Sequence, residues 1–319
     1  MVRLDLRNQG LTAVPAEVFA HAQTLEVLDL SGNRLDSLPD EMARLTRLKI
    51  LFASNNDFTE LPAVLGRCPS LEMVGFKANR IARVAETALP ARLRWLILTD
   101  NALESLPETI GQCQRLQKVM LAGNRLRCLP TSLARCGQLE LLRLAANAFE
   151  RAEEALPQGL LKLPRLSWLA YAGNPFCEAW GFAGDQDAPA GPPMPGVASI
   201  DWQQLHWGEC LGEGASGTIH AARWAAEPQA EPRAVAVKIF KGEVTSDGWP
   251  RSEMSACIAA GPHPHLVAVL GRLTGHPPAR AGLVLGRMPA GYRNLAGPPS
   301  FDSCTRDVYA PCFALPLAQ

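Results

Sequence analysis

Leucines and other apolar residues recur in a fixed pattern through the first half of the chain. The unit is L-x-L-x-x-N, a short alternation of apolar positions closed by a polar residue. Alternation of this kind predicts a short strand whose leucines point inward, because strand side chains alternate between two faces. The unit returns every 22 to 27 residues, and its closing residues are Gln9, Asn33, Asn56, Asn79, Asn101, Asn124, Asn147 and Asn174.

One such unit cannot bury its leucines alone, so we expect the units to stack into a solenoid. The closing asparagine should turn inward and bond backbone groups of the neighbouring turn, which stacking would otherwise leave unpaired. Several units continue with x-L-x-x-L-P, as at Leu126 to Pro130. The pattern resembles the leucine-rich-repeat family over about residues 1–176. The resemblance implies an α/β solenoid of eight repeats, and we place this domain at residues 1–177.

The residues between the inward leucines should line the concave face of the solenoid, which solenoids use for binding. Many are large and apolar, and a contiguous exposed apolar patch marks an interface. We therefore predict a protein or peptide partner on this face. Docking against the chain's own second domain and an unused apolar face are the alternatives. The predicted partner-binding residues are Ile50, Phe52, Met73, Trp95, Ile97, Met120 and Trp168, with Val27 and Leu141 in equivalent positions.

Charge and cysteine content bear on the possible binding partners and on the cellular location. The 31 basic residues balance 31 acidic ones, which disfavours a general grip on nucleic acid or on an anionic membrane. The opening residues contain no long apolar run, which disfavours a secretory signal, and no 18-residue uncharged apolar stretch occurs, which disfavours a membrane span. We therefore interpret the nine cysteines as reduced thiols and expect a cytoplasmic location. Cys68, Cys113 and Cys136 occupy the same place in their units. We interpret them as small buried residues, with a metal site as the alternative.

After Asn174 the repeat stops, and a stretch rich in Pro, Gly and Ala follows. We interpret residues 178–199 as a semi-extended linker and residues 200–319 as a second domain. Near its start, Gly212, Gly214 and Gly217 form G-x-G-x-x-G after a strand-like stretch. The same spacing occurs in dinucleotide-binding domains, where a helix and a suitably placed acidic residue follow. Here a β-rich run ending in Lys238 follows instead.

The sequence after Lys238 predicts one helix, one turn and two strands, in that order. A short helix is predicted around Glu253, with Pro250 in its first turn and Gly261 at its end. The turn H-P-H-L-V begins at His263 and leads into two more apolar strands, the second followed by residues 287–291 as a hinge. This series resembles the first lobe of the protein-kinase family, which has an antiparallel sheet and one helix. A metal at the two histidines of the turn is disfavoured because no third ligand is near.

The resemblance is to a bacterial-type leucine-rich-repeat Ser/Thr protein kinase, and it implies ATP binding. Glycines would let the backbone approach the phosphates, Lys238 would hold the α- and β-phosphates, and Glu253 would orient Lys238 as an ion pair. A solvated strand lysine and an exposed helix carboxylate are the alternatives. The implied ATP-binding residues are Leu211, Gly212, Glu213, Gly214, Ala215, Ser216, Gly217, Ile219, Ala236, Lys238 and Glu253.

Phosphotransfer in that family also needs an H-R-D-x-x-x-x-N motif and a D-F-G motif, whose side chains include the base and the magnesium ligands. Neither motif occurs; the R-D at Arg306 is followed by no asparagine. We therefore expect a first lobe only, no catalytic residue, no metal ligand, weak ATP binding and an unpartnered segment beyond about Pro289. Mg²⁺ would belong to the complete family domain. A non-catalytic interaction scaffold with a vestigial lobe is the alternative function.

Overall fold

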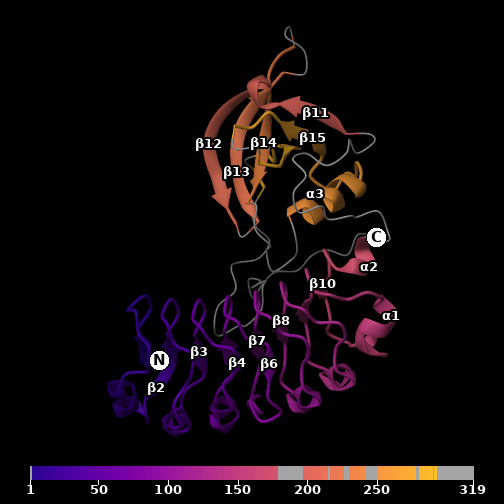
Figure 1. Cartoon of the computed structure of the whole chain (residues 1–319). Helices are drawn as coiled ribbons and strands as arrows, with labels where there is room; N and C mark the ends of the chain where they lie inside the picture. Colours follow the sequence, from indigo (N-terminus) through magenta and orange to yellow (C-terminus); the bar gives the residue numbers. More distant parts are fainter. Residues whose placement is uncertain are drawn as a thin grey trace.

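A computed structural model describes residues 2–178, 197–214, 216–225, 230–241, 250–277, 280–289 and 291–292. It contains an eight-stranded parallel sheet built from the first part of the chain and a six-stranded sheet built from the second part (Figure 1). A third sheet has two short strands, β4 (Glu60–Leu61) and β6 (Arg83–Val84). None of the helices in these ranges has the length and hydropathy that a bilayer span requires.

The eight-stranded sheet is the predicted stack of repeats, with one strand from each unit. Its neighbours pair in parallel and in matching positions, so each residue of one strand lies beside its counterpart in the next coil. The sheet has eight strands, one for each unit of the sequence pattern. The strands, in spatial order, are β1 (Val2–Asp5), β2 (Leu25–Asp29), β3 (Ile50–Phe52), β5 (Met73–Gly75), β7 (Trp95–Ile97), β8 (Lys118–Met120), β9 (Leu141–Arg143) and β10 (Trp168–Ala170).

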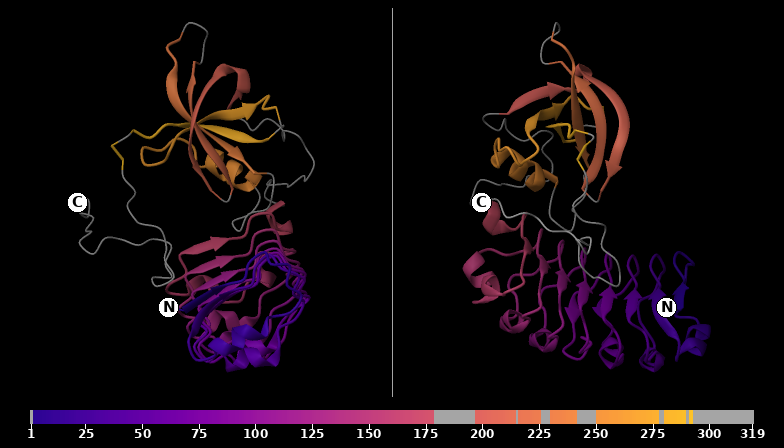
Figure 2. Two further views of the ribbon diagram at one scale, coloured as in Figure 1. Left: turned by 90° about the vertical axis from the view of Figure 1, so that its left-hand side faces the viewer. Right: turned by 180° about the vertical axis from the view of Figure 1, so that it is seen from behind.

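The side opposite the strands carries short helical turns, and successive coils overlie one another when the stack is viewed end-on (Figure 2). Strands sit about 4.8 Å apart whereas helical turns need more room, so the strand side is the concave one. The turns are η1 (Ala16–His21), η2 (Asp40–Arg44), η3 (Ala63–Arg67), η4 (Glu108–Gln112), η5 (Thr131–Arg135), α1 (Ala152–Ala155) and η6 (Leu160–Lys162), and α2 (Pro175–Glu178) ends the described part of the stack.

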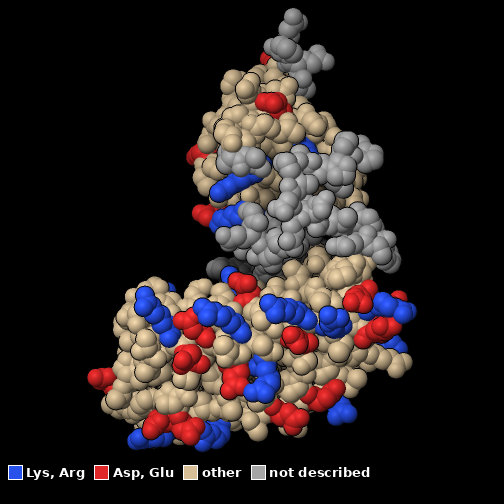
Figure 3. Space-filling model, in the orientation of Figure 1, with Lys and Arg blue, Asp and Glu red and all other residues tan. Residues whose placement is uncertain are grey.

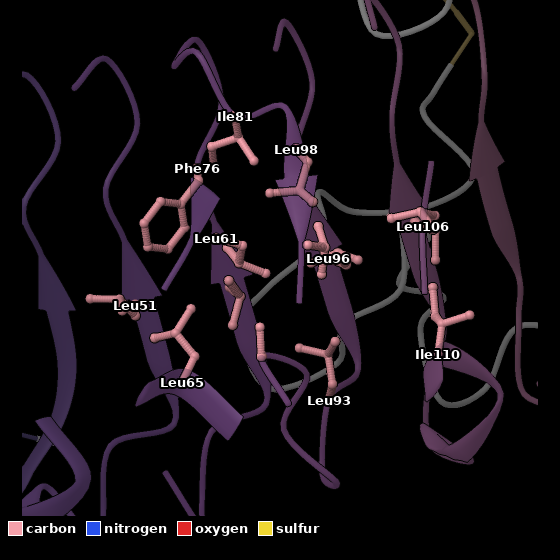
Figure 4. Close-up of a cluster of buried hydrophobic side chains, with 14 of the residues drawn as sticks. Leu51, Leu61, Leu65, Phe76, Ile81, Leu93, Leu96, Leu98, Leu106 and Ile110 are labelled. Carbon is pink, nitrogen blue, oxygen red and sulfur yellow. The ribbon is translucent and has the colours of Figure 1, made fainter. Parts of the chain in front are cut away.

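The core of the solenoid is a continuous apolar column between the strands and the turns. Inward leucines such as Leu51 and Leu96 are fully buried, and Phe58 and Phe76 meet edge to face inside it (Figure 4 shows Phe76 and the leucines). Each buried leucine or phenylalanine contributes on the order of 1.5–3 kcal/mol relative to exposure. Because every coil shares this column with its neighbours, no coil holds its core alone.

The closing asparagines form a buried or partly buried hydrogen-bonded ladder, as predicted. The Oδ1 atom of Asn124 accepts from the backbone N–H of Leu103 at 2.9 Å, and its Nδ2 donates to the carbonyls of Leu98 and Leu121 at 2.9 Å. Two of these partners belong to the preceding coil. Six further asparagines, Asn33, Asn56, Asn79, Asn101, Asn147 and Asn174, repeat the arrangement.

The three repeat-slot cysteines are buried, which confirms their interpretation as packing residues. Each thiol points to a backbone carbonyl, as in the 3.4 Å contact from the Sγ of Cys136 to the oxygen of Ile110. Burial raises the pKa of the Cys113 thiol to about 11 and that of Cys136 to about 12. Within the described ranges, no group of three or more His, Cys, Asp or Glu side chains is placed to hold a metal ion.

The second sheet has five antiparallel strands and one strand added in parallel at its edge. Helix α3 (Pro250–Ala259) packs on it through Met254, which meets Phe240 and Leu283. The order across the sheet is β11 (Ala198–Asp201), β15 (Val269–Thr274), β16 (Gly282–Gly286), β14 (Arg233–Phe240), β13 (Gly217–Trp224) and β12 (Leu205–Glu213); the turn η7 (Trp202–Gln204) links β11 to β12.

The predicted helix and strands of this unit are therefore present. Gly261 has φ of +66°, a left-handed conformation suited to glycine, and its N–H donates to Ile258 where α3 ends. Strand β11 was not predicted, and its first two residues, Ala198 and Ser199, fall inside the predicted linker. Most of the linker and most of the segment beyond Pro289 lie outside the described residues.

Candidate binding surfaces

The strand positions that face away from the core form two rows along the concave face. The pairing register fixes both rows, because paired residues of parallel strands share a face. All seven predicted partner-binding residues fall on them. The first row is Val27, Ile50, Met73, Trp95, Lys118, Leu141 and Trp168, and the second is Asp29, Phe52, Gly75, Ile97, Met120, Arg143 and Ala170.

Part of the first row is buried, so the exposed apolar patch that we expected is not contiguous there. Ile50 and Met73 are only 3% and 2% exposed, and with Val27 they form a small apolar cluster. Side chains one strand apart pack on one another, and Phe52 and Trp95 pack against the cluster from its edge. Ile97 and Met120 are half-buried, and Trp168 is 38% exposed.

Charged side chains interrupt the rows at positions that the apolar pattern alone did not predict. The ammonium of Lys118 lies 4.1 Å from the ring centroid of Trp95, and a guanidinium nitrogen of Arg143 lies 4.0 Å from the sulfur of Met120. At the other end, Asp29 has Arg3 and Arg7 within 4 Å. Counting 23 residues on from each predicted position would have found Lys118, since the coils repeat with that spacing.

Beside the first row, at the start of the strands, runs a band of ion pairs that we call the basic margin. Glu72 sits there among three arginines: Arg92 at 3.7 Å, Arg94 at 3.3 Å and Arg115 at 3.6 Å. On the face of the solenoid that Figure 3 shows, cationic and anionic side chains are interspersed. The residues of the margin are Glu26, Arg47, Lys49, Glu72, Arg92, Arg94, Arg115, Glu140 and Arg165.

In the second sheet, several of the residues predicted to bind ATP share one face. Gly212 pairs with Ile219, Ile219 with Lys238, and Lys238 with Leu283, so one row crosses four strands. Ala236 lies two residues before Lys238 and therefore on the same face. The alternate residues of β14, including Val235 and Val237, are buried in the opposite core.

Lys238 and Glu253 form an ion pair that joins strand β14 to helix α3. The lysine side chain is 15% exposed and the glutamate 40% exposed. The ammonium also lies 5.0 Å from the ring centroid of Phe240. Because Met254, the next residue of α3, is anchored in the core, the register of the helix directs Glu253 to the lysine.

The three glycines of the hairpin between β12 and β13 differ in what surrounds them. A Cβ atom built on Gly212 or Gly214 would meet nothing within 4 Å, whereas one on Gly217 would lie 2.3 Å from the carbonyl oxygen of Ile239. The first two glycines thus leave open space above the backbone, and the third is required for close packing against β14. Leu211 beside them is 44% exposed, and Ala215 lies outside the described residues.

The sequence analysis did not predict that Lys241 holds this hairpin through a set of contacts that we call the clamp. The Nζ atom of Lys241 contacts Glu213 at 2.6 Å and the carbonyl of Gly214 at 3.2 Å, and its backbone N–H donates to Ser216 at 2.9 Å. The hydrogen bond from Lys241 holds the pKa of Glu213 below its ordinary value. A lysine just after a strand carries no distinctive sequence signal, because its partners lie 25 or more residues away.

Comparison with known proteins finds similarity to the repeats. Residues 1–58 match the family model described as leucine rich repeat. Leucine-rich repeats and immunoglobulin-like domains protein 3 of Homo sapiens is 31% identical over 108 residues, 33% of this chain and 10% of that protein. The probable inactive serine/threonine-protein kinase roco10 of Dictyostelium discoideum is 30% identical over 120 residues, 36% of this chain and 4% of that protein.

Plant intracellular Ras-group-related LRR protein 8 of Oryza sativa subsp. japonica is 30% identical over 118 residues, 36% of this chain and 31% of that protein. The chain thus spans less than a third of the length of each of these relatives. Among solved structures, a leucine-rich-repeat protein of Leptospira interrogans has a TM-score of 0.43 and 28% identity, covering 54% of this chain and 48% of that one. The family match, the relatives and the stacked coils together make the first part of the chain a leucine-rich-repeat solenoid.

Proposed function

We propose that the solenoid recognises a protein or peptide segment along its concave face. The observation that carries the proposal is the half-buried apolar run of Trp95, Ile97 and Met120, set between charged side chains in register across neighbouring coils. An apolar centre with a polar rim is the usual composition of a recognition surface. An extended peptide laid across the strands would contact several coils at once.

A random peptide library displayed on phage and selected on the full chain tests this proposal. We expect selected peptides to lose binding to the variants Ile97→Asp and Met120→Asp, because a carboxylate would be buried against apolar groups. Leu161→Asp is the matched control, since Leu161 lies on η6, away from the strands, and is 68% exposed. Peptides that bind all three variants equally would show that the concave face is not the binding surface.

A second candidate function is the binding of ATP phosphates by a kinase-type first lobe in residues 200–292. Two observations favour it: the ion pair between Lys238 and Glu253, and the open space above Gly212 and Gly214. Lys238 would hold phosphate oxygens, and the hairpin would cover them with backbone N–H groups. The residues that hold Mg²⁺ in that family have no counterpart in this sequence, so we assign no metal-dependent step.

Titration of the full chain with ATP, followed by ligand-observed NMR, tests the second function. We expect binding no tighter than the millimolar range, because a one-sided site buries little of the ligand. Lys238→Ala should abolish the signal, while Lys162→Ala on η6 should leave it unchanged. Equal signals from both variants would favour the alternative, an interaction scaffold with a vestigial lobe.

A further inference from the structure

The basic margin carries more positive than negative charge where the solenoid meets its proposed ligand. Its cations are Arg47, Lys49, Arg92, Arg94, Arg115 and Arg165, six in all, and its carboxylates are Glu26, Glu72 and Glu140, three in all. The whole chain is neutral, so the excess of three positive charges is a local feature.

The excess is concentrated around Glu72. Arg94 already uses two partners, Glu72 at 3.3 Å and Gln117 at 3.0 Å. Arg92 and Arg115 both contact the same Oε1 atom of Glu72, and their side chains are 53% and 48% exposed. A guanidinium has five N–H donors, so one shared oxygen leaves most of their donors to the solvent side.

The two exposed arginines are also close enough to act on one ligand group. Their contacting nitrogen atoms lie 3.7 and 3.6 Å from a common oxygen, so they are no farther apart than the sum of those distances. They come from adjacent coils, three residues before the paired strand residues Trp95 and Lys118, and Trp95 is half-buried. A carboxylate between them would accept charge-assisted bonds from both sides.

We propose that Arg92 and Arg115 form an anion subsite that receives an aspartate or glutamate side chain of an acidic partner peptide, with an adjacent apolar residue of that peptide against Trp95. Charge complementarity favours this partner, because the margin would repel a basic segment and give a neutral one no advantage. The assignment rests on the proposed function of the concave face and deepens it by naming the chemistry of the partner.

Fluorescence anisotropy with a labelled ten-residue peptide of alternating Glu and Leu tests the subsite on the full chain. The matched probe has Gln in place of each Glu. We expect the Glu peptide to bind about tenfold more tightly than the Gln peptide, and the double variant Arg92→Gln/Arg115→Gln to remove that difference, because the charge-assisted bonds are lost. Raising the salt from low to high concentration should weaken only the Glu peptide.

Two further variants separate the subsite from net charge and from folding. Arg83→Gln/Arg127→Gln removes the same charge from exposed arginines outside the margin and should leave binding unchanged. Glu72→Gln removes the competing carboxylate and should tighten binding of the Glu peptide, an effect that a purely structural role would not produce.

The subsite would be overturned by equal binding of both peptides, by an equal loss in the Arg83→Gln/Arg127→Gln variant, or by equal competition from a dodecamer of thymidylate, which would indicate a general polyanion surface. The proposed function fails separately. Library peptides that lose binding to Met120→Asp but bind the Arg92→Gln/Arg115→Gln variant unchanged would contradict the subsite and leave the concave-face proposal intact.

Discussion

At the scale of single residues, the position before each closing residue, Gln9 or asparagine, has a positive φ in all eight coils. The residues there are Asn8, Gly32, Asn55, Ala78, Asp100, Gly123, Ala146 and Gly173. Glycine, asparagine and aspartate tolerate this left-handed conformation, whereas alanine strains its Cβ against the following carbonyl. The stacking of the coils therefore imposes the turn on Ala78 and Ala146 against their own preference.

Replacing Ala146 by glycine should stabilise the solenoid. The strain at φ of +52° is relieved, and the gain, reduced by the greater freedom of glycine in the unfolded chain, should be about 0.5–1 kcal/mol. Urea denaturation followed by circular dichroism measures it. Ala148→Gly, two residues on and without a positive φ, should destabilise; a loss of stability in both variants would contradict the strain.

Hydrogen bonds to the carboxylate of Glu108 make the stability of the solenoid depend on pH. Its carboxylate accepts from the N–H groups of Thr131 and Ser132 at 2.9 Å, and hydrogen bonding to Ser132 first and Thr131 second lowers the pKa of Glu108 from 4.5 to about 2. A depressed pKa contributes stability above the unfolded value that is lost as the pH falls toward the folded value.

The melting temperatures of the native chain and of Glu108→Gln should therefore differ most above pH 5 and converge as the pH falls toward 2. Thermal melts across this range measure the difference. A gap that stays constant with pH would show that the carboxylate charge plays no part in capping η5.

At the scale of elements, the sequence predicted what depends on local pattern and missed what depends on distant partners. The inward leucines and the asparagine ladder follow from spacing, and the end of α3 follows from Gly261. Strand β11 could not be predicted, because its pairing with β15 joins residues about 70 positions apart within a stretch rich in Pro and Gly. The burial of Ile50 and Met73 depends on cross-strand packing, which a single strand does not reveal.

In the candidate sites too, the sequence predicted some contacts and missed those that depend on neighbouring coils. The pairing of Lys238 with Glu253 was implied by a family resemblance and is present, whereas their role with ATP remains a prediction. The basic margin went unnoticed because each of its arginines looks like an ordinary surface residue until adjacent coils bring them to Glu72.

The clamp on the glycine hairpin leads to a prediction for this element. Lys241→Met should loosen the hairpin while keeping the backbone bond to Ser216. Amide exchange at Gly214 should speed by about two- to fivefold, because an exposed ion pair contributes about 0.2–1 kcal/mol. Hydrogen-exchange mass spectrometry measures this on the full chain, and Lys49→Met, on the solenoid, is the matched control. Unchanged exchange at Gly214 would show that the backbone bond alone holds the hairpin.

At the scale of the whole molecule, the two sheets have separate apolar cores. Residues 1–178 should fold alone and melt cooperatively, because the solenoid core draws on no residue of the second sheet. Circular dichroism of that fragment should show mixed helix and strand content and one transition. A fragment without a transition would mean that the solenoid depends on residues beyond it.

The 319-residue chain should transfer no phosphate. Its sequence has neither the H-R-D-x-x-x-x-N nor the D-F-G motif, so no residue matches the base or the magnesium ligands of the kinase family. Incubation with labelled ATP, magnesium and acceptor proteins should give no more transfer than Lys238→Ala. Reproducible transfer that this substitution removes would overturn the expectation.

The residue-by-residue register between coils has a consequence for how repeat units can be gained or lost in evolution. Each strand pairs only with strands of adjacent coils, and each asparagine side chain bonds only its own coil and the coil before it. Loss or duplication of one whole unit by unequal recombination, for example residues 102–124, would therefore leave every buried ladder bond with an equivalent partner. Loss of that unit would also remove Arg115 and bring Glu140 beside Arg94, in the place that Gln117 holds now. Lineages could thus change the specificity of the concave face in single steps while the fold stays intact.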